Sequence, residues 1–225
     1  MKHLPIFLAL LCSAAAMAQV DFKAEFEPDE HTVLLLHFNE KEGKPANAAD
    51  AKIKVAKMKA TLTEEGKFGG GLSLEEGILS VAHHPTLVMA GQMTVEMWIK
   101  PTEEDVGKGY HILAHKRAKP GRKLYLVLHN GRLRAYPDTT GRSRLVAGTW
   151  FHVAYVVTGT KEKGGREYLF INGLLDAERE STWEGVVEQV PLRLGGLPRG
   201  TERFKGVIDE VRISNVARPY PGVVK

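Results

Sequence analysis

The sequence has little cysteine and no long apolar run beyond its first residues. Its only cysteine is Cys12, which lies in a segment with a basic start, an apolar run over Ile6–Ala16 and the small-x-small sequence Ala16-Met17-Ala18. That pattern is typical of an export signal. Cleavage after it leaves no cysteine, so a disulfide framework is excluded and the fold must be held by its core or by a metal. We therefore expect residues 1–18 to be a signal peptide and the protein to be secreted or periplasmic.

A membrane span is also excluded by length. The apolar run of the leader is too short to cross a bilayer, and no comparable run follows it. A lipid anchor on Cys12 is disfavoured because Leu11 before it is larger than a lipidation site tolerates. We expect residues 19–30 to be a charged, loosely packed connector, residues 31–218 to be one domain, and residues 219–225 to be a tail.

The mature chain also lacks a convincing helical period, apart from one possible turn at Pro85–Met89. Short apolar segments separated by turn residues predict an all-β protein instead. The two sequences Asn130-Gly131 and Asn172-Gly173 predict two-residue hairpin turns. The predicted strands are Val33–Phe38, Leu72–Leu74, Ile78–Ala82, Thr94–Lys100, Tyr110–His115, Lys123–His129, Arg132–Tyr136, Trp150–Thr158, Glu167–Ile171, Leu174–Glu178, Leu192–Leu194 and Lys205–Ile213.

Six segments in order resemble the laminin G-like jelly-roll family, within the concanavalin A-like lectin/glucanase fold. They are Gly66–Leu74, Met93–Pro101, Gly148–Val157, Tyr168–Leu175, Pro191–Gly196 and Phe204–Arg218. The resemblance covers most of the mature chain and implies a two-sheet antiparallel jelly-roll sandwich. Members of this family bind glycans or proteins, so the resemblance alone does not fix a function.

The last of these segments contains a carboxylate that needs a partner. Alternation predicts one face with Val207, Asp209, Val211 and Ile213, and another with Ile208, Glu210 and Arg212. The resemblance implies one structural calcium ion, held by Asp209 and by Asp50 from the loop Ala46–Ala51. That loop lacks the family's Asp-x-Ser-Gly-Asn-Gly sequence and is followed by Lys52. In the alternative, Asp209 accepts backbone N–H bonds and fixes the last strand to the first.

Two further groups of residues are candidates for ligand binding. Glu96 and Trp98 share the outer face of their predicted strand, where they could stack on and hydrogen-bond a sugar; alternatively, Trp98 packs under a loop and Glu96 pairs with a base. Residues 108–144 contain ten Lys and Arg and one acid, Asp138. Within this stretch Arg132 and Arg134 alternate onto one face, as do Arg142 and Arg144. These four arginines could bind sulfate or carboxylate groups, or form a solvated basic rim.

Catalytic signatures are missing. The Glu-x-Asp-x-x-Glu sequence of related glucanases is absent, because Met97 and Trp98 follow Glu96, and no Gln-x-His of similar lyases occurs. His111 and His115 are four residues apart, but on a predicted strand they lie on one face and well apart, unlike the i, i+4 zinc pair of a helix. We therefore predict no catalytic residues and no cofactor besides calcium.

The resulting prediction is an exported, non-catalytic module that binds carbohydrate, with a preference for anionic extracellular or cell-surface glycans. The alternative is a structural or adhesive module that binds a protein partner and has no glycan site. A glycoside hydrolase or polysaccharide lyase is the least favoured reading. Nucleic acid is not an expected partner, because the chain is exported and aromatic residues are not interleaved with its basic ones.

Overall fold

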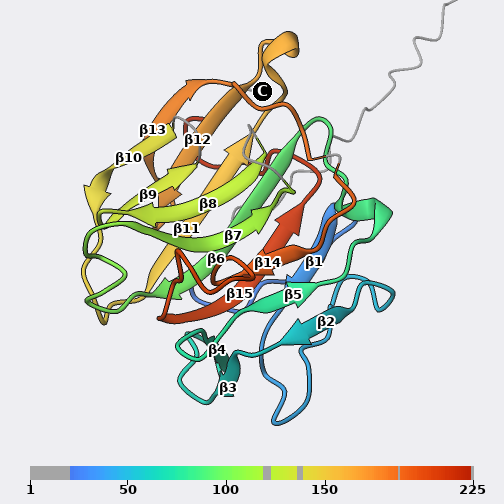
Figure 1. Cartoon of the computed structure of the whole chain (residues 1–225). Helices are drawn as coiled ribbons and strands as arrows, with labels where there is room; N and C mark the ends of the chain where they lie inside the picture. Colours follow the sequence, from blue (N-terminus) through green and yellow to red (C-terminus); the bar gives the residue numbers. More distant parts are fainter. Residues whose placement is uncertain (1–20, 119–122, 136–138, 187, 224–225) are drawn as a thin grey trace, which may run out of the picture.

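The computed structural model describes residues 21–118, 123–135, 139–186 and 188–223. The signal peptide predicted at residues 1–18 lies outside this part of the chain. Two antiparallel sheets lie face to face (Figure 1). Sheet I has eight strands in the order β13-β12-β11-β6-β15-β4-β3, with β1 paired to β15. Its strands are β1 (Thr32–Leu36), β3 (Thr61–Thr63), β4 (Gly71–Ser73), β6 (Met93–Lys100), β11 (Phe151–Val157), β12 (Arg166–Ile171), β13 (Leu174–Glu180) and β15 (Val207–Ser214).

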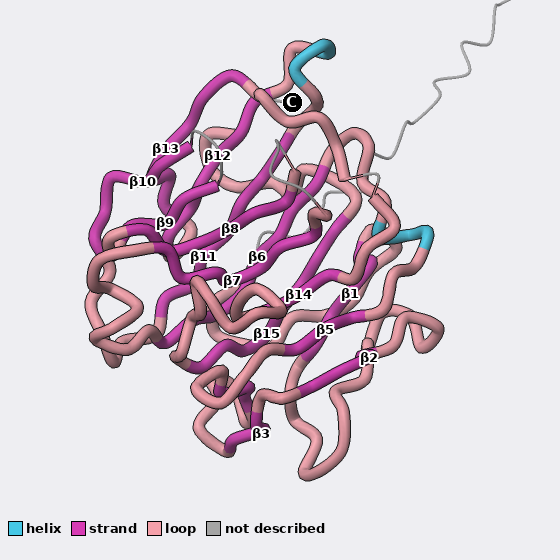
Figure 2. The backbone as a smooth tube through the Cα atoms, viewed as in Figure 1, coloured by secondary structure: helices cyan, strands magenta, loops and turns pink. Residues whose placement is uncertain are grey.

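Sheet II has seven strands in the order β10-β9-β8-β7-β14-β5-β2. They are β2 (Val55–Met58), β5 (Leu79–Val81), β7 (Tyr110–Lys116), β8 (Leu124–His129), β9 (Arg132–Ala135), β10 (Thr139–Arg144) and β14 (Leu192–Leu194). Helical structure within the described residues is limited to two short 3-10 turns, η1 (Pro85–Leu87) and η2 (Lys161–Lys163) (Figure 2). No helix in the described part of the chain is long and apolar enough to cross a membrane.

The core lies between the sheets, and along β6 and β8 it is built by alternation. From β6 it receives Val95, Met97 and Ile99, and from β8 it receives Leu124, Leu126 and Leu128, all of them fully buried. The residues between them point to the outer faces of the two sheets. The sequence-based all-β jelly-roll prediction is therefore confirmed, and each predicted strand overlaps an observed one.

Both predicted Asn-Gly turns are present in the structure. At both predicted Asn-Gly turns the two residues have positive φ angles, 51° and 74° for Asn130 and Gly131 and 50° and 76° for Asn172 and Gly173. Two-residue hairpins of this kind need such angles.

Three strands were not predicted from the sequence: β2, β3 and β10. The first two are three or four residues long, and β10 reads Thr-Thr-Gly-Arg-Ser-Arg, without an apolar side chain to mark its inner face.

Candidate functional site

The closing strand β15 contains a bulge that changes which residues share a face. Asp209 pairs with Trp98 and Arg212 with Glu96, so β15 uses one residue more than β6 between these two pairs. Glu210 is the extra residue of this bulge, and its φ is 51°. As a result Ile208 and Val211 both join the core, while Asp209 and Arg212 lie opposite outer-face residues of β6. The predicted face that combined Asp209 with Val211 and Ile213 was wrong, because strict alternation cannot anticipate a bulge.

Asp209 is a fully buried anchor. Its Oδ2 accepts backbone N–H bonds from Lys67 (2.8 Å) and Phe68 (2.9 Å), and its Oδ1 accepts one from Glu210 (2.7 Å). Burial raises the pKa of Asp209 to about 7, although these N–H bonds act in the opposite direction. The interpretation of Asp209 as a backbone acceptor is confirmed. It fixes β15 to the loop before β4, however, and not to the first strand.

The predicted calcium ligands are engaged in local hydrogen bonds. Asp50 Oδ1 accepts the N–H of Lys52 (2.8 Å), and the Asp50 carbonyl accepts from the side chain of Asn47 (3.0 Å). N–H donors therefore face the carboxylates of both Asp50 and Asp209, whereas calcium requires free oxygen lone pairs. These contacts fit a hydrogen-bonded anchor better than a calcium centre. Calcium at Asp50 and Asp209 stays a prediction.

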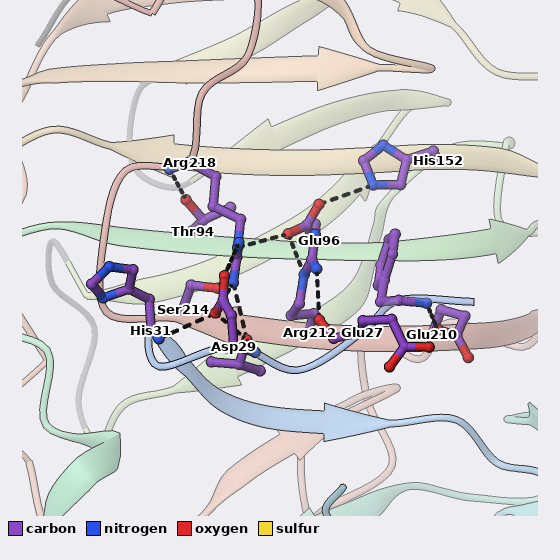
Figure 3. Close-up of polar contacts among 12 residues, drawn as sticks. Glu27, Asp29, His31, Thr94, Glu96, His152, Glu210, Arg212, Ser214 and Arg218 are labelled. Carbon is purple, nitrogen blue, oxygen red and sulfur yellow. Dashed lines mark hydrogen bonds and ion pairs between the residues drawn. The ribbon is translucent and has the colours of Figure 1, made fainter. Parts of the chain in front are cut away.

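Glu96 lies at the centre of a buried polar network on the outer face of sheet I (Figure 3). Its carboxylate is 2.8 Å from Arg212 Nε, 3.3 Å from His152 Nε2 and 3.6 Å from Arg218 Nε, and it accepts a hydrogen bond from the Tyr220 hydroxyl. Burial alone would raise the pKa of Glu96, but His152 and Arg212 hold it at about 2. The carboxylate is therefore ionised beside the guanidinium groups of Arg212 and Arg218, while burial lowers the pKa of His152.

The network extends to the two ends of the described chain. Arg218 donates to both carboxylate oxygens of Asp29 (2.9 and 2.8 Å) and to Ser214 Oγ (2.7 Å), and its backbone N–H donates to Thr94 Oγ1 (2.9 Å). The hydrogen bond from Arg218 is the main reason that the pKa of Asp29 is well below its usual range. Both segments are visible against sheet I in Figure 3.

The N-terminal segment, residues 21–31, covers the centre of this face. The Phe22 ring meets those of Trp98 and His152 edge-on, at centroid distances of 6.3 and 4.8 Å. Phe26 is 3% exposed, lies 4.2 Å from the Arg212 guanidinium and donates its N–H to Glu210. Residues 19–30 were expected to be a loosely packed connector; in its described part Phe26 is buried and Phe22 half-buried against sheet I, while the other side chains are exposed.

The C-terminal tail completes the cover. Tyr220 is stacked on Phe170 at 4.5 Å and on His152 at 6.1 Å. Glu96 is consequently 0% and Trp98 5% exposed. The sequence left two roles open for these residues, sugar binding or internal packing. Internal packing describes their surroundings: Trp98 packs under a segment of the chain, and Glu96 pairs with basic side chains. A ligand cannot reach them in this conformation.

The four predicted arginines lie on the opposite side of the molecule, on sheet II. Their strands β9 and β10 are paired, with Arg144 opposite Arg132 and Thr140 opposite Arg134. Leu133 and Ala135 point inward and are buried, so Arg132 and Arg134 point outward. On β10 the side chains of Arg142 and Arg144 are exposed. The predicted ligand residues therefore form two separate groups, one covered and one accessible.

An aromatic stack adjoins the arginines. Tyr110 and His129 are parallel, with ring centroids 4.1 Å apart. Arg134 Nη1 contacts the Tyr110 hydroxyl and His129 Nδ1 at 3.4 and 3.3 Å. A shallow depression of about 350 Å³ is lined by Tyr110 together with Lys108, Arg203, Lys205, Glu104 and Glu202. Sequence reasoning missed the stack, because Tyr110 and His129 lie on different strands and meet only through the register of β7 with β8.

A laminin G family model, described as the concanavalin A-like lectin/glucanases superfamily, matches residues 76–221. The chain belongs to this superfamily. A comparison with curated proteins found no match. Among solved structures, the binding domain of Paraclostridial Mosquitocidal Protein 1 is similar with a TM-score of 0.63 and 14% identity, over 84% of this chain and 50% of that one. The botulinum neurotoxin serotype D binding domain has the same TM-score and identity, over 84% and 49%.

A third similar structure is domain 4 of AbnA, an extracellular arabinanase of Geobacillus stearothermophilus, in complex with arabinotriose. Its TM-score is 0.57 at 17% identity, over 84% of this chain and 94% of that domain. The chain thus spans about half the length of the toxin domains and nearly all of the arabinanase domain. At these identities the likeness establishes the lectin/glucanase fold alone. The predicted family resemblance is confirmed.

Proposed function

We propose that this protein is an exported, non-catalytic carbohydrate-binding module that takes anionic glycans on the outer face of sheet II. The observation that carries the proposal is the group of Arg132, Arg134, Arg142 and Arg144 on the paired strands β9 and β10, with Arg132 opposite Arg144. Guanidinium groups bind sulfate and carboxylate through two parallel hydrogen bonds. The neighbouring Tyr110 ring offers an apolar surface on which a sugar could stack.

Two further observations support a binding role. The similar toxin structures are named as binding domains, and the arabinanase domain is named as a complex with an oligosaccharide. The buried carboxylate of Glu96 is neutralised by its own neighbours and covered by the chain, so it is unsuited to acid–base catalysis. The secreted or periplasmic location follows from the predicted signal peptide and belongs to the same proposal.

A binding assay with charged and neutral oligosaccharides tests this function. We expect sulfated or uronic-acid oligosaccharides to bind at low salt, binding to weaken as salt is added, and arabinotriose to bind more weakly. Arg132→Ala with Arg134→Ala should weaken binding about tenfold or more, since a charge-assisted hydrogen bond contributes about 1.5–3 kcal/mol. Lys161→Ala with Lys163→Ala is the matched control: it removes the same charge from the exposed turn η2 and should leave affinity unchanged.

A second candidate function, adhesion to a protein, has its own observation. The hairpin between β12 and β13 exposes Leu174 (74%) and Leu175 (42%) at the edge of sheet I. Absence of binding to every glycan, together with capture of a defined extracellular protein that is lost on Leu174→Ser, would favour this alternative. Turnover of any polysaccharide by the purified chain would contradict both functions.

A further inference from the structure

Three side chains with metal-binding chemistry converge beside the bulge of β15. Glu25 comes from the N-terminal segment, His37 follows β1, and Glu210 is the bulged residue itself. One nitrogen or oxygen atom of each lies within 4.8 Å of the others. Within the described residues, no other group of three or more histidine, cysteine or acidic side chains meets this criterion.

Neighbouring groups hold both carboxylates in place. Glu210 Oε2 accepts the backbone N–H of Phe26 at 2.6 Å, while its Oε1 is 2.6 Å from His37 Nδ1. Glu25 Oε1 accepts from Asn39 Nδ2 at 2.8 Å. Glu25 is therefore oriented through one oxygen, and Glu210 through both, the second by its hydrogen bond with His37 inside the cluster. Outer hydrogen bonds of this kind are typical of carboxylate ligands at metal sites.

The bulge places the carboxylate of Glu210 in the cluster. Its side chain is fully buried, and its φ of 51° accommodates the extra residue of β15. The bulge thereby sets this buried carboxylate against the imidazole of His37.

We propose that Glu25, His37 and Glu210 bind one divalent transition-metal ion of the zinc class. Imidazole nitrogen with carboxylate oxygens suits zinc, whereas calcium and magnesium prefer oxygen alone. Tetrahedral zinc ligands at about 2.0–2.2 Å place their donor atoms about 3.3–3.6 Å apart. The His37 and Glu210 atoms, now 2.6 Å apart, would separate as the ion displaces the proton of their hydrogen bond to solvent, and the exposed Glu25 would move inward. The two carboxylates balance the charge of the ion.

The site differs from the predicted calcium ligands Asp50 and Asp209, and it has a structural consequence. Glu25 belongs to residues 21–31, the segment that covers Glu96 and Trp98, whereas His37 and Glu210 belong to sheet I. A bound ion would therefore fix the N-terminal segment to the sheet and slow its detachment.

Zinc titration of the chelator-treated chain tests the site. Calorimetry should give one ion per chain and the melting temperature should rise with zinc, since a ligand that binds only the folded state stabilises it. Glu25→Gln and His37→Gln should each weaken zinc binding tenfold or more. Glu30→Gln, an exposed carboxylate of the same segment, and His84→Gln are matched controls and should leave it unchanged.

Hydrogen exchange gives a second readout, measured on the native chain and on one variant whose substituted side chain is exposed. Zinc should slow exchange of the amides in residues 21–31 of the native chain but not of Glu25→Gln, whose substituted side chain is exposed in the native structure. The proposal is overturned if excess zinc gives no heat of binding and no melting shift. It is also overturned if both ligand variants bind zinc as the native chain does, because the ion would then occupy another site.

Discussion

The buried pair of Glu96 and Arg212 should be the most sensitive electrostatic contact of sheet I. We predict that Arg212→Met, which keeps most of the apolar stem, destabilises the protein by about 3–5 kcal/mol, as expected when one partner of a buried ion pair is removed. At their 2.8 Å separation the attraction is about 6 kcal/mol for an effective dielectric constant of about 20. In Arg212→Met the Arg218 guanidinium, 3.6 Å from Glu96, still attracts the carboxylate. The expected loss of stability is therefore smaller than the full attraction between Glu96 and Arg212.

Equilibrium unfolding in urea at pH 7 measures the loss. The exposed pair Arg166 and Glu178, 3.4 Å apart on the edge of the same sheet, supplies the matched control: Arg166→Met should cost less than about 1 kcal/mol. Adding Glu96→Gln to Arg212→Met should recover about 2 kcal/mol relative to the sum of the single changes, because the uncompensated charge is gone. A cost for Arg212→Met equal to that of Arg166→Met, or strictly additive changes, would refute the interpretation of Glu96 as a buried ion.

Two other predictions concern pH and the chain ends. His115 is 1% exposed, and burial lowers its pKa from 6.5 to about 4; the unfolded state therefore takes up a proton first as pH falls, and about 3 kcal/mol should be lost between pH 6.5 and 4. Unfolding of His115→Leu should lack this component, and an identical pH dependence in both proteins would contradict it. Phe26→Ala should cost about 3 kcal/mol and shift the combined emission of Trp98, Trp150 and Trp183 to the red as water reaches the Trp98 indole; unchanged emission would mean that the N-terminal segment does not cover Trp98.

Much of the fold could be predicted from the sequence, because its determinants are local. Alternating apolar residues and Asn-Gly turns define strands and hairpins one segment at a time, which is how the segments around Val95 and Leu126 were placed correctly. The bulge at Glu210 could not be found this way. A single extra residue has no composition of its own, and it reverses the face of every residue that follows.

The candidate sites differ in the same way, according to whether their residues lie on one strand or on distant segments. The common face of Arg132 and Arg134 follows from alternation within one strand and was predicted. The cover over Glu96 depends on Phe26 and Tyr220, which come from opposite ends of the chain and meet only in the folded protein. The cluster of His37 with Glu25 and Glu210 has no motif spacing for the same reason.

Residues 21–31 and Tyr220 cover Glu96 and Trp98 on the outer face of sheet I, and we propose that glycans bind on sheet II instead. Nuclear magnetic resonance of the labelled protein, titrated with a sulfated oligosaccharide, tests this directly. The account predicts that shifts concentrate on amides of β9 and β10, over residues 132–135 and 139–144, and that Arg132→Ala with Arg134→Ala reduces them. Shifts confined to β6, β11 and β15, with β9 and β10 unaffected, would contradict it.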